Sequence, residues 1–326
     1  MHLQWKLPRR ESKTLKKMIS RRHIRLKVMQ SLYAFQSKKN ISISVAEKEM
    51  LSHIQDIINL KLSIISLFLF IYKHADNFFE KNKNKFLPKQ EDINPNKKLI
   101  NNLFYKFFFS DKQLIKRLEK FSSFWNENDH DIIRKIFMEI FKSDHYKDYL
   151  KSTSESYKDD VRFFNNILND IILNHKVLHH ILEEKSIYWI DDLPFVATMI
   201  MGDFKDQKIR LKKSAFKNSD DKSFAIDLFK KTIKNDKAYE KVIIEKAKNW
   251  DLERIAIMDQ IMIKMSFCEI LNMPELPIKV SLNEYIEISK YYSTNKSKLF
   301  INGLIDSAVI DFTKKNMIVK KGRGLM

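Results

Sequence analysis

Hydrophobic residues recur along most of the chain at the three- and four-residue spacing that lines one face of an α-helix. Val28, Leu32 and Phe35 follow this spacing, so we predict a helix over residues 20–36 in which they form the core stripe. The same pattern predicts further helices at residues 98–109, 111–123, 130–142, 251–272, 281–291 and 299–312.

Capping signals locate the starts of two helices. Ser44-x-x-Glu47 predicts a helix that runs, with a break, to about Asn77, and Ser281-x-x-Glu284 predicts the start of another. The charged or polar stretches that we interpret as a linker and a joint are residues 81–98 and 143–158.

Two segments of the chain resemble each other. Residues 159–201 match residues 220–262 at a constant offset of 61, with nine identities in the first 31 positions. The last of these identities pairs Trp189 with Trp250. We interpret the match as a duplicated helical hairpin. The alternative is a chance likeness between amphipathic helices of similar composition.

Glycine and proline are scarce, at 4 and 6 residues among 326. Tight turns and phosphate-binding loops depend on glycine, because glycine adopts positive φ without steric cost. A turn-rich sheet and a nucleotide-binding α/β domain are therefore disfavoured, and the predicted fold class is all-α.

Positive charge is concentrated at the two ends of the chain. The formal charge is +19, of which residues 1–40 carry +11 and residues 311–326 carry +4. We interpret residues 1–19 as a flexible basic arm and residues 313–326 as a basic tail. Such segments suit a polyanion, most simply nucleic acid, because neutralised phosphates release counterions. A solubilising role is the alternative for the tail.

The sequence favours a soluble, cytoplasmic protein. Its longest uncharged and largely apolar run, residues 62–72, has 11 residues. A membrane-spanning helix needs about 20, so we predict a buried core helix instead. Cys268 is the single cysteine and lies among apolar residues, which fits an inert thiol in a reducing compartment.

No motif for catalysis or cofactor binding is present. The sequence contains neither a glycine-rich dinucleotide or phosphate loop nor a His-Glu-x-x-His metal motif. His175, His179 and His180 have helical spacing, but the second copy of the repeat replaces all three. We therefore predict no catalytic residue, no metal and no cofactor.

Four motifs occur in a fixed order. They are Arg21-Arg22-x-x-Arg25 ahead of Gln30-Ser-Leu-Tyr33-Ala-Phe-Gln36; Trp250-x-x-Glu253-Arg254 ahead of Glu269-Ile-Leu; Pro277-Ile-Lys279-Val280-Ser-Leu-Asn283-Glu284; and Ser297-Lys-Leu-Phe300-Ile-Asn302-Gly303. In this order and spacing they resemble the NusB family of bacterial transcription antitermination factors. The resemblance covers residues 20–40 and 222–312, and residues 41–221 are then an inserted helical region.

The resemblance implies an all-α fold of NusB-like helical bundles, here with a large helical insertion that contains the first copy of the duplicated hairpin. It also implies a function. Family members bind boxA, a short single-stranded element of nascent ribosomal RNA, together with NusE, a ribosomal protein of the small subunit. The complex assists RNA polymerase by suppressing termination. We therefore expect a non-enzymatic RNA-binding protein whose partners are boxA-like RNA, NusE and the polymerase antitermination complex.

The resemblance assigns RNA contacts to two groups of residues. Arg21, Arg22 and Arg25 lie at a helix start, where they can contact phosphates. Tyr33 can stack on a base or, alternatively, pack in the core. The second group, which we expect in a short polar loop, is Lys296, Ser297, Lys298 and Phe300, and Phe300 could equally be a core residue. Glu269 falls on the surface that the family presents to NusE.

Two rival functions are compatible with a helical chain. A related helical domain precedes RNA cytosine methyltransferases, but no glycine-rich S-adenosylmethionine loop or catalytic cysteine follows the last motif. The other rival is a protein-binding scaffold, in which residues 41–221 form the main working surface and RNA binding is secondary.

Overall fold

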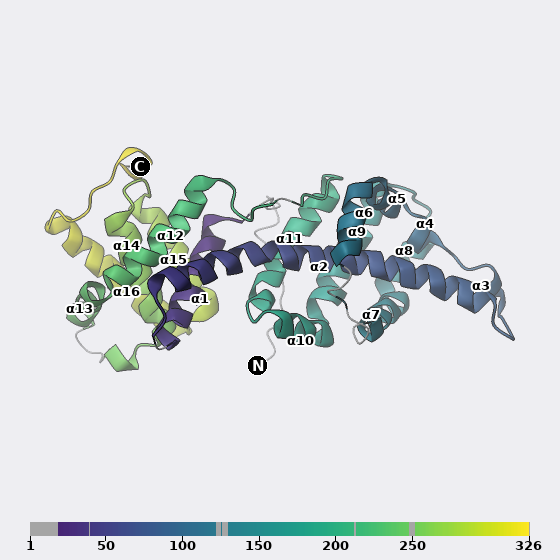
Figure 1. Ribbon diagram of the computed structural model, residues 1–326, viewed down its shortest axis with the longest axis horizontal. Coiled ribbons are helices and arrows are strands. Elements are labelled where there is room, and N and C mark those ends of the chain that lie inside the picture. Colours follow the sequence, from purple (N-terminus) through teal and green to yellow (C-terminus); the bar gives the residue numbers. More distant parts are fainter. Residues whose placement is uncertain are drawn as a thin grey trace. The chain divides into compact units, whose positions relative to one another are not determined.

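The computed structural model describes residues 19–38, 40–121, 125, 130–211, 213–247 and 252–325 (Figure 1). Within these residues the regular secondary structure is entirely helical, which confirms the predicted all-α class. The chain divides into two compact units. Among the described residues, the terminal unit consists of residues 19–54 and 216–325, and the central unit consists of residues 55–215.

The terminal unit is built around one helix that is surrounded by others. Its helices are α1 (Arg21–Ser37), the first part of α2 (Ile43–Lys83), α12 (Ser219–Lys234), α13 (Asp236–Lys246), α14 (Ile257–Asn272), α15 (Ile278–Tyr292) and α16 (Asn295–Lys314). Helix α14 packs against α1, α12, α13, α15 and α16, and residues 261–270 are all buried. A helix buried on every side is apolar around most of its circumference, so its three buried charges, Asp259, Lys264 and Glu269, need partners.

Helix α2 is longer than predicted and unbroken, running from Ile43 to Lys83. The side-chain oxygen of Ser42, rather than that of Ser44, accepts the first-turn hydrogen bond, from the Val45 amide at 3.3 Å. The predicted break is wrong because the segment contains neither proline nor glycine, the residues that most often interrupt a helix.

The apolar run inside α2 is buried, as predicted. Leu62 through Leu69 are inaccessible or nearly so. By length and composition α2 could cross a membrane, but 72% of its most apolar window is buried inside the protein. Core helices of soluble proteins have the same property.

The central unit packs several short helices around the later part of α2. They are α3 (Gln90–Ile93), α4 (Lys98–Asn101), α5 (Leu103–Ser110), α6 (Lys112–Lys120), α7 (His130–Lys142), α8 (Asp144–Lys151), α9 (Tyr157–Asn166), α10 (Lys176–Lys185) and α11 (Trp189–Lys205). Phe68 of α2 meets Phe104 of α5, Phe164 of α9 and Phe204 of α11, with ring centroids 5.3–6.2 Å from that of Phe68. These four rings, from four helices, form the centre of the core. Helices α3 and α8 lie in stretches that we interpreted as a linker and a joint.

The two copies of the proposed repeat have similar helix order but different contacts. Helices α9 and α10 begin within one residue of the positions that the offset of 61 predicts from α12 and α13. Asp160, however, caps α5 by accepting from the Leu103 amide at 2.8 Å, whereas Asp221 binds Arg21. Trp189 is buried and donates to the Asp56 carboxylate at 2.7 Å. Trp250 lies outside the described residues, so the duplication stays a prediction.

The C-terminal segment packs back onto the terminal unit. The Lys320 ammonium donates to the carbonyls of Glu269 and Met273 at 3.3 and 3.0 Å, and thereby caps the end of α14. The Lys321 amide donates to the Pro274 carbonyl at 3.1 Å. A side chain at Gly324 would meet the same carbonyl oxygen at 2.0 Å, so only glycine permits this approach. The predicted arm at residues 1–19 lies, apart from Ile19, outside the described residues.

Candidate nucleic-acid interface

Helix α1 carries the arginine motif and begins where the sequence predicts. Ser20 adopts an extended conformation and its hydroxyl accepts from the His23 amide, so the helix starts at Arg21. Val28 and Leu32 are buried against the rest of the terminal unit, as the spacing predicts, while Phe35 is only half-buried. Its ring meets that of Phe229 of α12 edge-on, with 6.2 Å between centroids.

Each arginine of the motif pairs with a carboxylate from a different helix. Arg21 donates to Asp221 of α12 at 3.0 Å, and its guanidinium lies 5.1 Å from the Phe224 ring centre. Arg22 forms two hydrogen bonds to Glu284 of α15, at 2.8 and 2.9 Å. The side chains of Arg21 and Arg22 are 41% and 33% exposed. They therefore keep a solvent-facing edge while they hold α1 in place.

Arg25 is an internal residue. Its side chain is 2% exposed and donates to both carboxylate oxygens of Glu269, at 2.6 and 2.8 Å. Two parallel N–H···O bonds match the planar guanidinium to the planar carboxylate. Burial alone would lower the pKa of Arg25, but the charge of Glu269 and its hydrogen bonds outweigh burial and raise it. Arg25 therefore stays charged, and the expected phosphate contact is corrected to a buried ion pair.

Glu269 is also internal, which corrects its expected place on a partner-binding surface. The residue is 0% exposed. Besides Arg25, it accepts from the Ser281 hydroxyl at 2.8 Å and from the Tyr285 hydroxyl at 2.6 Å. Burial, followed by the charge of Glu269, raises the pKa of Tyr285 well above its usual value. The predicted cap at Ser281 is wrong for the same reason, because α15 begins at Ile278 and the Ser281 side chain points into this cluster.

Tyr33 lies on the open side of α1. Its side chain is 43% exposed, which removes the core alternative that the sequence left open. Tyr33 and Gln36 are three residues apart on the helix and therefore share a face. Both are exposed, so this face is available for stacking and hydrogen bonding.

The second predicted group lies in the first turns of α16 rather than in a loop. Thr294 caps the helix by accepting from the Ser297 amide at 3.1 Å, so residues 296–298 are helical. Lys296 is exposed, whereas Ser297, Lys298 and Phe300 are half-buried. Helices α1 and α16 both pack against α14 and α15, which places the two groups in the same unit.

Two exposed apolar side chains near this turn were not predicted as site residues. Tyr291, at the end of α15, is 66% exposed and Leu299, in α16, is 77% exposed. Their positions flank Lys296 and Lys298 in the sequence. For Tyr291 the signal that could have identified it was an aromatic residue close to a lysine pair, whereas Leu299 carries no such signal.

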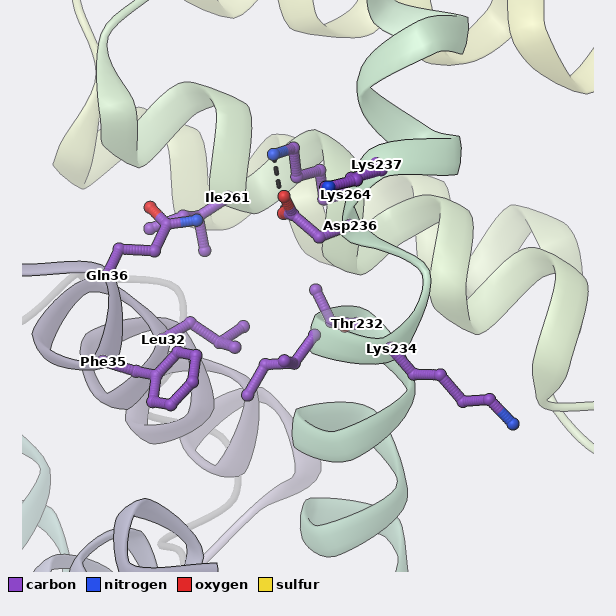
Figure 2. A pocket seen from close by; sticks show the side chains of 10 residues that line it. Leu32, Phe35, Gln36, Thr232, Lys234, Asp236, Lys237, Ile261 and Lys264 are labelled. Atoms are coloured by element: carbon purple, nitrogen blue, oxygen red, sulfur yellow. Dashed lines mark hydrogen bonds and ion pairs between the residues drawn. The ribbon is translucent and has the colours of Figure 1, made fainter. Parts of the chain in front are cut away.

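A pocket of about 390 Å³ opens beside the C-terminal end of α1 (Figure 2). Its apolar wall comes from Leu32 and Phe35 of α1 with Ile233 of α12 and Ile261 of α14. Its polar lining is Gln36, Thr232, Lys234, Asp236, Lys237 and Lys264. An apolar wall that faces polar side chains is a combination found in small-molecule sites.

Lys264 is the buried charge of this pocket. The residue is 3% exposed, and its ammonium donates to Asp236 at 2.6 Å and lies 3.5 Å from Glu240, as the dashed line in Figure 2 marks for Asp236. Lys234 and Lys237 are exposed at the pocket's edge. The charge of Lys264 is thus balanced by two carboxylates, and Lys234 and Lys237 remain exposed to solvent.

Comparison with known proteins places the later part of the chain in a family. A family model described as NusB matches residues 196–309. Transcription antitermination protein NusB of Salinibacter ruber is 40% identical over 105 residues, which are 32% of this chain and 66% of that protein. The chain contains a NusB-family domain.

Other NusB proteins align over a similar length. That of Chloroherpeton thalassium is 38% identical over 105 residues, 32% of this chain and 50% of its own length. That of Thermodesulfovibrio yellowstonii is 42% identical over 89 residues, 27% of this chain and 59% of its own. The chain therefore spans between half and two thirds of the length of these relatives. No solved structure matches the chain significantly.

The NusB-family match begins inside α11, includes α12 to α15 and most of α16, and does not include α1. Helix α1 nevertheless packs against α12, α14 and α15 of that domain. The three arginine–carboxylate pairs bind α1 to those same helices. The terminal unit therefore contains most of the NusB-family match, together with α1, the start of α2 and the C-terminal segment, whereas matched residues 196–215 lie in the central unit.

Within the described residues no group of three or more histidine, cysteine, aspartate or glutamate side chains could hold a metal ion. Cys268 is fully buried in α14, and burial raises the pKa of its thiol to about 11. The thiol is therefore protonated at neutral pH, the form that is a poor nucleophile.

Proposed function

We propose that this protein is a transcription antitermination factor that acts without catalysis in the cytoplasm. In this proposal it binds boxA-like single-stranded RNA of nascent ribosomal RNA together with NusE and assists RNA polymerase. The NusB-family domain at residues 196–309 is the observation that carries the proposal. The names of the relatives, each a transcription antitermination protein, support it.

The RNA surface that we propose runs along the open side of the terminal unit. Tyr33 stacks on one base, and the pocket beside Gln36 receives a neighbouring base against Leu32 and Phe35. Lys234 and Lys237 lie at the pocket's edge, where they can contact phosphates. Single-stranded RNA is commonly recognised by such a combination of aromatic stacking and basic side chains.

In this proposal Arg21 and Arg22 contact RNA phosphates while they remain paired with carboxylates of the protein. Each already binds a carboxylate, so a phosphate shares the guanidinium with Asp221 or Glu284. The exposed edge of Arg21 has N–H groups that can donate to a phosphate. Lys296 and Lys298 provide charge on α16, and Ser297 and Phe300 position them within the first turns of the helix.

Tyr33 provides the sharpest test of this surface. We expect Tyr33→Ala to weaken binding of a labelled boxA-like oligoribonucleotide by about 1–3 kcal/mol, the range for loss of one stacked base. Tyr33→Phe keeps the ring and should retain most of the affinity. Fluorescence anisotropy of the full chain measures both, at two salt concentrations.

A lysine pair tests the electrostatic part. Lys296→Gln with Lys298→Gln should flatten the salt dependence of binding, by about 0.7 in the logarithmic slope for each phosphate that the variant no longer neutralises. Lys241→Gln with Lys279→Gln, at exposed lysines of α13 and α15, is the control with the same change of charge. If Tyr33→Ala and the Lys296/Lys298 pair both bind RNA like the unchanged protein while remaining folded, the RNA surface is not here.

A protein-binding scaffold is the alternative function. Residues 1–195, which include most of the central unit, lie outside the family match. On this alternative, a Tyr33→Ala variant that no longer binds RNA still supports antitermination in a reconstituted transcription assay. On the main proposal, the same variant is defective in both RNA binding and antitermination.

A further inference from the structure

The turn between α2 and α3, in the central unit, exposes two large apolar side chains. Phe86 is 97% exposed and Leu87 is 81% exposed, the highest values among large hydrophobic residues of the described chain. Pro88 follows them and favours a rigid, extended approach. Two adjacent apolar side chains held in water at a turn are unfavourable unless a ligand covers them.

The same turn is strongly basic. Residues 81–89 read Lys-Asn-Lys-Asn-Lys-Phe-Leu-Pro-Lys, with four lysines and no acidic residue. All four lysines are exposed. The nearby carboxylates are engaged: Asp92 accepts from the Lys85 ammonium at 3.3 Å and from the Lys89 amide at 3.1 Å, and Glu80 accepts from Lys97 at 2.6 Å. Glu91 is the remaining acid of this turn.

A pocket of about 550 Å³ lies against this basic turn. Aromatic rings line it, from Phe78 and Phe79 of α2, Phe141 of α7 and Tyr146 of α8. Lys85 and Lys89 also line it, together with Glu91 and Asp92. The amides of Asn82, Asn94 and Asn96 contribute donors and acceptors. Its volume falls within the range of about 300–1,000 Å³ that is usual for small-molecule sites.

We propose that this end of the central unit is a second single-stranded RNA site, separate from the surface on the terminal unit. An unpaired base enters the aromatic pocket, where the asparagine amides hydrogen-bond its edge. Phe86 stacks on the next base, and Lys81, Lys83 and Lys89 contact phosphates. Aromatic stacking beside a basic groove is how sequence-tolerant single-stranded sites are built.

A membrane surface explains these features less well. Stable membrane attachment of a peripheral protein needs more than one strong anchor, and two apolar side chains bury little area. A lipid headgroup also has no use for a pocket lined by aromatic rings and three amides. The charge and the ring-lined pocket together therefore favour RNA.

The test uses the full chain and a 20-nucleotide single-stranded RNA in which 4-thiouridine replaces every uridine. After photocrosslinking and proteolysis, mass spectrometry maps the attached peptides. We expect crosslinks within residues 78–98. Affinity is measured in a Tyr33→Ala, Lys296→Gln, Lys298→Gln background, so that the central unit is assayed with the terminal surface weakened.

In that background Phe86→Ala should weaken binding about five- to hundredfold, as for loss of one stacked base. Lys81→Gln with Lys83→Gln and Lys89→Gln should reduce the salt slope by about 2. Ile187→Ala, at a residue that is 72% exposed in the same unit, is the matched apolar control. Lys176→Gln with Lys205→Gln and Lys208→Gln is the control for charge; these lysines lie in α10, at the end of α11 and just beyond it, away from the α2–α3 turn in Figure 1.

Two results would overturn the inference. One is an absence of crosslinks in residues 78–98 with affinities of the turn variants equal to those of their controls. The other is cosedimentation with anionic phospholipid vesicles that Phe86→Ala abolishes while RNA affinity stays unchanged, which assigns the turn to a membrane. The inference stands apart from the proposed function: if the Tyr33 and Lys296/Lys298 changes leave RNA binding intact but Phe86→Ala reduces it, the terminal surface fails and the second site holds.

Discussion

Replacing Glu269 by glutamine tests whether the buried ion pair holds the terminal unit together. Glu269 is fully buried and accepts four hydrogen bonds, two from Arg25 and one each from Ser281 and Tyr285. Glutamine has nearly the same volume, so it creates no cavity. It removes the negative charge and turns one of the two acceptor oxygens into an N–H donor that faces another donor.

The expected cost is large because Arg25 then remains charged in a buried site. Removing one partner of a buried ion pair typically costs about 3–5 kcal/mol of folding free energy. Placing an amide N–H against the donors around the old carboxylate adds to this, because an unsatisfied buried group costs about 1–3 kcal/mol. The side chain of Arg25 is 2% exposed, so water does little to relieve either cost. We therefore expect Glu269→Gln to lower the free energy of unfolding by at least about 3 kcal/mol.

Urea unfolding followed by circular dichroism measures the effect. Glu287→Gln is the control, since it breaks a solvent-exposed pair with Lys290 on α15; such pairs contribute about 1 kcal/mol or less. The double change Arg25→Met with Glu269→Leu removes both charges and should recover much of the stability. A Glu269→Gln protein that unfolds within about 1 kcal/mol of the unchanged protein would refute the internal role of this pair.

Two further predictions concern the same unit. The raised pKa of Tyr285 means that the unfolded chain loses the hydroxyl proton at a lower pH than the folded chain. The contribution of this proton to the free energy of unfolding is therefore complete below about pH 10 and is lost as the pH rises further. Tyr285→Phe should reduce the decline of the unfolding free energy between about pH 10 and 11 by up to about 1.4 kcal/mol per pH unit. Gly324→Ala should undock the C-terminal segment, because the added carbon meets the Pro274 carbonyl oxygen at 2.0 Å, and trypsin should then cleave faster after Lys320 and Lys321. Gly303→Ala, which meets nothing within 4 Å in the middle of α16, is its control and should leave the cleavage rate unchanged; equal rates for both variants would contradict the docked position of Gly324.

The spacing of hydrophobic residues predicted the helices that bury one apolar face. Val28 and Leu32 lie in the core, and the uncharged run within α2 is buried, because both patterns reflect burial of apolar area, the dominant force in folding. The exposure of Tyr33 is the case that periodicity left open. Tyr33 adjoins the stripe without belonging to it, and only the packing of neighbouring helices decides how far such a residue is covered.

The buried polar cluster could not be predicted from local sequence. Arg25 and Glu269 are 244 positions apart, and neither residue differs locally from an exposed charge. Ser281 shows the same limit: its spacing to Glu284 fits a capping box, yet α15 starts earlier, after Pro277, and the hydroxyl turns inward to Glu269. Charges that are buried in pairs are recognisable only once the helices that carry them are in contact.

The arginine motif is therefore as much a determinant of the fold as a candidate RNA contact, and the length of the chain makes this role important. About 160 residues of the central unit separate the start of α2 from α12, and α1 must still find α12, α14 and α15. Closing a longer loop costs little, about 0.6 kcal/mol for each doubling of length. Burying Ile24, Val28 and Leu32 contributes about 1.5–3 kcal/mol for each side chain, which exceeds that cost several times over.

Apolar burial alone does not fix which way α1 points, but three arginines that meet carboxylates on three different helices do. A central unit of this size between α1 and α12 is tolerated because the docking of α1 is specified by its own side chains and not by the connection to it.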